Sequence, residues 1–175
     1  MKTLVTGGTG LVGSAINAEV YLSSTNVDLR NTSETFEIFE SILPDKVIHC
    51  AARVGGLGGN MNYKGEYFYD NMMMNLNVLE ASRRVGVKKL VSFMSTCVFP
   101  DDVEYPLTEK KIHLGEPHHS NYPYAYAKRM VEVQSRAYKE QYGVNYVSII
   151  PTNIYGPNDN FDLHQGHVMP MLIHK

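Results

Sequence analysis

The sequence predicts an α/β protein with a doubly wound parallel sheet, a Rossmann fold, and three observations support this. Short β-rich runs alternate along the chain with longer segments of helical periodicity. The first run leads directly into a glycine-rich loop. Two of the later runs, 47–52 and 147–150, are largely apolar without strict alternation, as in strands that are covered on both faces.

The strands are expected at 3–6, 19–23, 46–51, 89–95 and 145–150. The main helices are expected at 32–43, 66–85 and 122–142. Asn31 is the expected N-cap of the first of these, with Glu34 three residues later, and Phe36, Phe39 and Leu43 share one face. A helix should also follow the glycine loop, but only about ten residues separate Gly13 from Ser23, so it must be short.

Composition restricts the class of protein. A chain of 175 residues with 43% apolar residues fits one globular domain, and a net charge of −2 argues against a nucleic-acid binder. The apolar run after Met1 is too short for a signal peptide, and no stretch approaches the length of a membrane span. Cys50 and Cys97 are therefore expected to be reduced thiols in a cytoplasmic protein.

The glycine-rich loop predicts a binding site for the diphosphate of NAD(P). Gly7, Gly10 and Gly13 are spaced by three, follow an apolar strand and precede the apolar pair Leu11 and Val12. Such a loop lets the diphosphate approach the backbone, and the helix that follows presents its free N–H groups to the phosphates. The alternative is a purely structural turn between a strand and a helix.

The end of the second strand favours NADPH over NADH. A carboxylate at this place accepts from the ribose 2′-hydroxyl and repels a 2′-phosphate. Here the hydroxyl residues Ser23 and Ser24 come first, and no acid occurs before Asp28. The nearest cation is Arg30.

Tyr124 and Lys128 are four residues apart and would share one face of a helix. A nearby ammonium should lower the pKa of the phenol, which could then donate a proton to a ketone oxygen as a hydride arrives. The spacing alone is uninformative, since chance produces such pairs. It gains weight from Ser95 at the end of an upstream strand, where a hydroxyl can bind the same oxygen.

Several motifs resemble the extended short-chain dehydrogenase/reductase family: Asp28-Leu29, the stretch 49–52 and the stretch 124–128. Four further stretches, 54–56, 95–100, 151–161 and 166–170, narrow this to members that act on a GDP-4-keto-6-deoxy sugar. The resemblance implies NADPH-dependent epimerisation at C3 and C5 and reduction at C4. It implies a 1–150 nucleotide-binding domain, with 151–175 as the start of a substrate-binding region whose remaining lobe is missing.

The resemblance also assigns residues. The implied catalytic residues are Ser95, Cys97, Tyr124, Lys128 and His167, with Cys97 and His167 as the epimerisation pair. The implied cofactor contacts are Gly7, Thr9, Gly10, Leu11, Val12, Ser23, Ser24, Asp28, Leu29, Ala51, Ala52, Tyr124, Lys128, Pro151 and Asn153. The implied substrate contacts are Val54, Gly55, Gly56, Ser95, Thr96, Cys97, Asn153, His167 and Lys175.

Other interpretations stay open. Without the family, Cys97 would be a core residue, as Cys50 is expected to be, and His167 a surface residue. Pairs such as His118 and His119 lack further ligands for a metal, so no metal is expected. The run 72–74 of three methionines is expected in the core or a subunit interface. By analogy, helices 66–85 and 122–142 would form a homodimer interface. The chain could also act on another sugar nucleotide, bind NADP without catalysis, or be half of a split enzyme.

Overall fold

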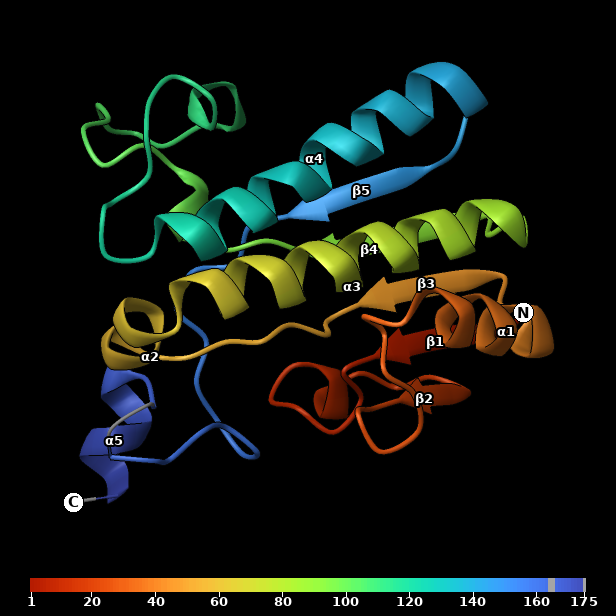
Figure 1. Ribbon diagram of the computed structural model, residues 1–175, viewed down its shortest axis with the longest axis horizontal. Coiled ribbons are helices and arrows are strands. Elements are labelled where there is room, and N and C mark those ends of the chain that lie inside the picture. Colours follow the sequence, from red (N-terminus) through yellow and green to blue (C-terminus); the bar gives the residue numbers. More distant parts are fainter. Residues whose placement is uncertain (164–165, 175) are drawn as a thin grey trace.

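The computed structural model describes residues 1–163 and 166–174, and its centre is a parallel sheet of five strands (Figure 1). The strand order is β2-β1-β3-β4-β5, and every neighbouring pair is parallel. The strands are β1 (Thr3–Thr6), β2 (Val20–Leu22), β3 (Lys46–His49), β4 (Lys89–Phe93) and β5 (Tyr146–Ile149). The predicted Rossmann-like α/β fold is confirmed. The last four strands are shorter than predicted because their final residues turn into loops.

Three long helices lie side by side over one face of the sheet (Figure 1). They are α1 (Thr32–Ile42), α3 (Lys64–Arg84) and α4 (Tyr122–Tyr142). Two short helices, α2 (Leu57–Asn62) and α5 (Val168–His174), lie near the end of the sheet at which the strands finish (Figure 1). The bounds of α4 match the prediction, and α3 is displaced by one or two residues from the predicted 66–85.

The start of α1 is capped as predicted. Asn31 Oδ1 accepts hydrogen bonds from the backbone N–H groups of Ser33 and Glu34, which would otherwise lack partners. Phe39 is fully buried, but the prediction for Leu43 is wrong. Leu43 ends α1 in the left-handed conformation, with φ of 49°, and this turns its side chain into solvent.

The connection from β1 to β2 contains no α-helix, which corrects the sequence prediction. The described chain forms only a 3₁₀ turn, Gly13–Ala15, after the glycine loop. Tyr21 stabilises this connection, because its hydroxyl donates to Ile16 O at 2.7 Å and accepts from Ala18 N at 2.8 Å. About a dozen residues suffice for a parallel crossover, but too few are left here for a helix to pack back across the sheet.

The core lies between the sheet and the long helices. Its fully buried members include Leu4, Phe39, Val47, Leu79 and Leu90. Among the described residues, no helix is both long enough and apolar enough to cross a membrane.

Candidate active site

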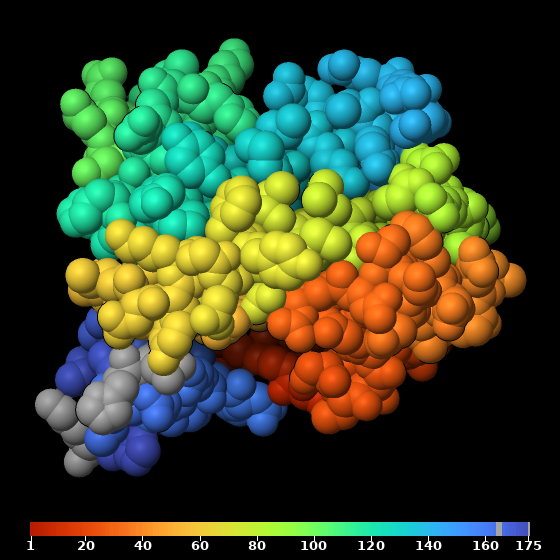
Figure 2. Space-filling view, viewed as in Figure 1, coloured from red at the N-terminus to blue at the C-terminus, as the bar shows by residue number. Residues whose placement is uncertain are grey.

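The site is a cleft of about 770 Å³ beyond the carboxyl ends of the strands. The glycine loop lies between the segment that follows β2 and the C-terminal segment around α5, and all three line the cleft. In Figure 2 the dark red atoms of the N-terminal segment are at the floor of a hollow between the orange and blue segments. Ligands of open α/β sheets bind at this edge, where the loops from successive strands converge.

The glycine loop is tightly folded against its neighbours. Gly7 has φ of 71°, a left-handed conformation, and a Cβ there would lie 2.7 Å from Ala51 N. A Cβ on Gly13 would overlap Gly7 O. Within the described chain, the amide N–H groups of Leu11 and Val12 have no protein acceptor, and both residues line the cleft. The loop therefore offers free backbone donors to an anion although no α-helix follows it.

Lys128 reaches the cleft from the core. Its side chain is buried, and Nζ donates to the carbonyl oxygen of Phe93, the last residue of β4, at 2.9 Å. Burial lowers the pKa of this ammonium to about 8. The same Nζ lies 5.8 Å from the ring centroid of Tyr124, one turn earlier on α4. The predicted pairing of Tyr124 and Lys128 on one face of a helix is thus present.

The sequence analysis predicted a lowered pKa for Tyr124, but in this chain the pKa of Tyr124 is raised. Burial raises the pKa of this phenol, and neighbouring Cys97 and Tyr67 raise it further. Lys128 does not offset this effect, because its ammonium is turned towards Phe93 O. Tyr124 is therefore a protonated phenol at neutral pH, the form required of a proton donor.

Ser95 and Cys97 are brought together by a turn. β4 ends at Phe93, before the predicted end of this strand at 95, and a 3₁₀ turn, Thr96–Val98, follows. Burial raises the pKa of the Cys97 thiol, and the neighbouring Ser95 side chain opposes this rise. Electrostatic coupling of Cys97 to both Tyr124 and Lys128 places all four groups in one cluster.

A buried chain of hydrogen bonds joins the sheet to α4. Thr6 Oγ1 lies 2.7 Å from His49 Nδ1, His49 Nε2 lies 3.0 Å from Asn75 Oδ1, and Asn75 Nδ2 donates to Ala127 O at 3.1 Å. Because the last bond fixes the Asn75 amide, Oδ1 must accept, so His49 carries its proton on Nε2 and accepts from Thr6 at Nδ1. This chain of hydrogen bonds ends at Ala127, next to Lys128, and holds α4 in its orientation about the helix axis.

His49 makes the stability of the fold depend on pH. Burial lowers its pKa to about 3, whereas the pKa in the unfolded chain stays near 6.5. A depressed pKa contributes stability that is complete above about pH 6.5 and is lost as the pH falls towards the folded value. Between pH 7.5 and pH 5 we expect the free energy of unfolding to fall by about 2 kcal/mol, measured by urea denaturation.

The variant His49→Gln is the matched control, since Gln can keep the polar contacts and does not titrate. Its free energy of unfolding should change much less over the same pH interval. An equal decrease in both proteins would contradict the assignment to His49.

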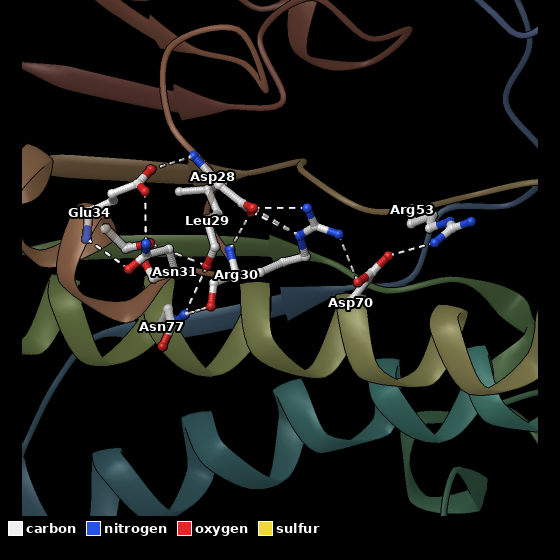
Figure 3. Close-up of polar contacts among 9 residues, drawn as sticks. Asp28, Leu29, Arg30, Asn31, Glu34, Arg53, Asp70 and Asn77 are labelled. Atoms are coloured by element: carbon white, nitrogen blue, oxygen red, sulfur yellow. Dashed lines mark hydrogen bonds and ion pairs between the residues drawn. The ribbon is translucent and has the colours of Figure 1, made fainter.

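Charged residues line the cleft on the side of the segment that follows β2 (Figure 3). Arg30 makes a two-pronged ion pair with Asp28, through Nε at 2.9 Å and Nη2 at 2.8 Å. Its Nη1 donates to Asp70 on α3 at 3.1 Å, and Asp70 also receives Arg53 Nη1 at 2.7 Å. Asn77 of α3 donates to the carbonyl oxygens of Leu29 and Arg30 and holds the same segment.

The turn after β2 presents hydroxyl groups. Ser23 Oγ lies 2.7 Å from Thr25 Oγ1, and Ser23 N donates to Asn26 Oδ1 at 3.0 Å. Ser24 is exposed and, like Ser23, lines the cleft.

Most of the predicted site residues line this one cleft. They are Gly7, Thr9, Gly10, Leu11, Val12, Ser23, Ser24, Asp28, Leu29, Ala51, Ala52, Val54, Gly55, Ser95, Tyr124, Lys128, Pro151, Asn153 and His167. Gly56, Thr96 and Cys97 do not line it, although Cys97 contacts Ser95 directly behind its wall. His167 is exposed at the start of α5, and Lys175 lies outside the described residues. No cluster of metal-ligating side chains occurs in the described ranges.

Some lining residues were missed by the sequence analysis. Met74 packs on the core, as predicted, but also lines the cleft, and Cys50 lines it rather than belonging only to the core. Asp70 and Phe93 line the cleft as well. The period of a helix predicts which face is buried, but it does not reveal which end of that face overhangs a ligand site.

The comparisons with known proteins agree with this geometry. The sequence profile of the NAD dependent epimerase/dehydratase family matches residues 3–175. The GDP-L-fucose synthase of Dictyostelium discoideum is 51% identical over 98% of this chain, which spans 57% of that relative. The probable GDP-L-fucose synthase of Drosophila melanogaster is 44% identical over 99% of this chain, and this chain spans 58% of that relative.

Solved structures show the same arrangement. A GDP-L-fucose synthetase from Naegleria fowleri, bound to NADP, has a TM-score of 0.91 at 46% identity and covers 98% of this chain, which matches 60% of that structure. A UDP-glucose 4-epimerase from Thermus thermophilus, in complex with NAD, has a TM-score of 0.77 at 28% identity over 93% of this chain and 58% of its own. This chain belongs to the NAD dependent epimerase/dehydratase family.

Proposed function

We propose that this chain is the nucleotide-binding part of a GDP-L-fucose synthase. With NADPH, it would epimerise C3 and C5 of GDP-4-keto-6-deoxy-D-mannose and reduce the ketone at C4. The main support is that Ser95, Tyr124 and Lys128 line the cleft with Cys97 beside Ser95, in a chain 51% identical to a named GDP-L-fucose synthase. The chain spans 57% of that relative, so the activity of the whole protein is part of the proposal.

The cleft fits a nicotinamide dinucleotide. The packing of Gly7 and Gly13 against neighbouring backbone fixes the shape of the glycine loop, and the free N–H groups of Leu11 and Val12 can donate to a diphosphate. The Lys128 ammonium has three N–H groups, and in the described chain its only hydrogen-bond partner is Phe93 O. The remaining donors suit hydroxyl groups of the nicotinamide ribose. A relative's structure holds NADP, and bound NADPH would supply the hydride that reduces C4.

Tyr124, Ser95 and Lys128 would carry out the proton transfer of the reduction. Burial keeps Tyr124 protonated, so its hydroxyl can donate a proton to the C4 oxygen while the Ser95 hydroxyl orients that oxygen. Lys128, with a pKa of about 8, is mostly protonated at neutral pH. Its remaining N–H groups would hold the nicotinamide ribose beside Tyr124.

Epimerisation would use Cys97 and His167. The C4 ketone acidifies the hydrogens at C3 and C5, and the same Ser95 and Tyr124 stabilise the charge that develops on the ketone oxygen. One side chain removes a proton from one face of the carbon, and the other returns a proton to the opposite face. Cys97 adjoins Ser95 and Tyr124, and His167 lines the cleft from the start of α5.

We further propose that 1–150 form the nucleotide-binding unit and 151–175 begin the substrate-binding region. The chain leaves the sheet after β5, and residues 151–155 and 167–170 line the cleft. The two cysteines form no disulfide and agree with a reducing, cytoplasmic location.

A homodimer through α3 and α4 is also part of the proposal. Both helices leave large apolar side chains exposed, among them Phe68 and Leu76 on α3 and Tyr122 on α4. Light scattering at micromolar concentration should give the mass of two chains. A clean monomer would count against this interface.

The decisive experiment is to incubate the chain with GDP-4-keto-6-deoxymannose and NADPH. NADPH oxidation and formation of GDP-fucose are expected, and parallel reactions with UDP- and dTDP-linked 4-keto sugars test the nucleotide. Turnover of only a UDP or dTDP sugar would refute the substrate. Binding of NADPH without turnover, with turnover restored by the C-terminal part of a relative, would identify one half of a divided enzyme.

A further inference from the structure

Arg30 donates to two carboxylates at the side of the cleft next to the turn after β2. Its Nε and Nη2 grip both oxygens of Asp28, and its Nη1 binds Asp70 (Figure 3). Hydrogen bonds to the guanidinium groups hold the pKa of both carboxyls below their usual range, so both are charged at neutral pH. Each of the three guanidinium nitrogens of Arg30 already donates to a carboxylate.

The charges around Arg30 cancel. Asp28 and Asp70 face Arg30 and Arg53, two negative against two positive groups that all line the cleft. Glu66 pairs with Arg53 and does not line the cleft. Without Arg30, this part of the lining would hold the carboxylates of Asp28 and Asp70 against the one guanidinium of Arg53. Asp28 would then have a free carboxylate a few residues from the hydroxyl turn at 23–26.

A free carboxylate near this turn discriminates between cofactors. It can accept from the ribose hydroxyls of NADH, and it repels the 2′-phosphate of NADPH, which adds up to two negative charges. The described turn contains no cation, so it has no charge of its own with which to offset Asp28.

We propose that Arg30 is a specificity-determining residue, which makes the site accept a 2′-phosphate by neutralising Asp28 and not by binding the phosphate itself. The phosphate then meets the hydroxyls of Ser23 and Ser24. This inference rests on the proposed use of NADPH. It differs from the sequence interpretation, in which Arg30 is simply the nearest cation available to the phosphate.

The test compares dissociation constants for NADPH and NADH, measured by cofactor fluorescence at low salt. Arg30→Met should weaken the binding of NADPH about tenfold more than the binding of NADH. The reason is that the uncovered carboxylate of Asp28 repels the 2′-phosphate, although solvent and salt partly screen this repulsion. The double variant Asp28→Asn with Arg30→Met should bring the NADPH-to-NADH ratio back to within about twofold of wild type. Asp70 keeps its ion pair with Arg53 in both variants, so the difference between the two variants reports the charge of Asp28.

The single variant Asp28→Asn separates the two roles of Arg30. If Arg30 acts by neutralising Asp28, this variant leaves the NADPH-to-NADH ratio of dissociation constants nearly unchanged, because Arg30 already cancels the charge of Asp28. A large gain in NADPH preference from this variant, together with no recovery in the double variant, would show that Arg30 binds the phosphate and would overturn the proposal. An unchanged NADPH-to-NADH ratio in Arg30→Met would also overturn the proposal. A folded wild-type chain that binds neither cofactor would instead refute the proposed function, and the inference with it.

Discussion

Replacing Gly13 by Ala is expected to abolish cofactor binding and to destabilise the fold by about 3 kcal/mol or more. The added Cβ would overlap Gly7 O and lie 2.8 Å from Gly7 C and 3.0 Å from Gly8 Cα. All three atoms belong to the backbone, so no side chain can rotate away, and Gly7 is itself pressed against Ala51. Urea denaturation measures the loss of stability, and NADPH fluorescence measures the loss of binding.

Two other glycines are controls. Gly65→Ala, in the first turn of α3, places its Cβ in open space and should leave both quantities near wild type. Gly10→Ala meets only Gly7 O, at 3.4 Å, so stability should be nearly preserved while a diphosphate on the loop loses its close approach. If Gly13→Ala keeps wild-type stability and affinity, the tight packing of this loop is refuted.

Replacing Tyr124 by Phe is expected to lower kcat for C4 reduction by about 10²- to 10⁴-fold, the usual contribution of a general acid. The phenol is the proposed proton donor, and it adjoins Lys128 and Cys97. Because the ring remains and the cleft keeps its shape, the dissociation constant for NADPH should change little. Single-turnover NADPH oxidation with the GDP-4-keto sugar measures the effect, in this chain or in the reconstituted enzyme.

Tyr122→Phe is the matched control, since this tyrosine is on the same helix but exposed and outside the cleft lining. It should retain kcat. A Tyr124→Phe variant with undiminished kcat would remove Tyr124 from the reaction. A loss confined to NADPH affinity would assign it to cofactor binding instead.

Local patterns predicted the framework of the molecule well. The bounds of β1 and α4 and the Asn31 cap follow from contiguous residues, because strand propensity, helical period and capping are short-range effects. The glycine loop was recognisable for the same reason. Fold and cleft therefore follow from signals that lie within a few residues of each other.

Long-range features could not be predicted in this way. One of the two carboxylate partners of Arg30 is Asp70, forty residues away on α3, and no local pattern connects these two residues. The pKa of Tyr124 depends on burial, which overrides the ammonium that spacing alone suggests. Cys97 meets Ser95 because β4 ends early and a 3₁₀ turn follows, a change of backbone that strand propensity did not indicate.

The connection from β1 to β2, which contains no α-helix, affects how easily this edge of the sheet unfolds locally. β2 is an edge strand of three residues, and β1 is its only neighbouring strand among the residues that the structure describes. Such segments open by local unfolding with a small free energy, so their amides should exchange with deuterium much faster than those of the central strands. A bound dinucleotide would bridge β2 to the rest of the cleft and slow this opening. The adenosine side of the site is thus the part whose order depends most on the ligand.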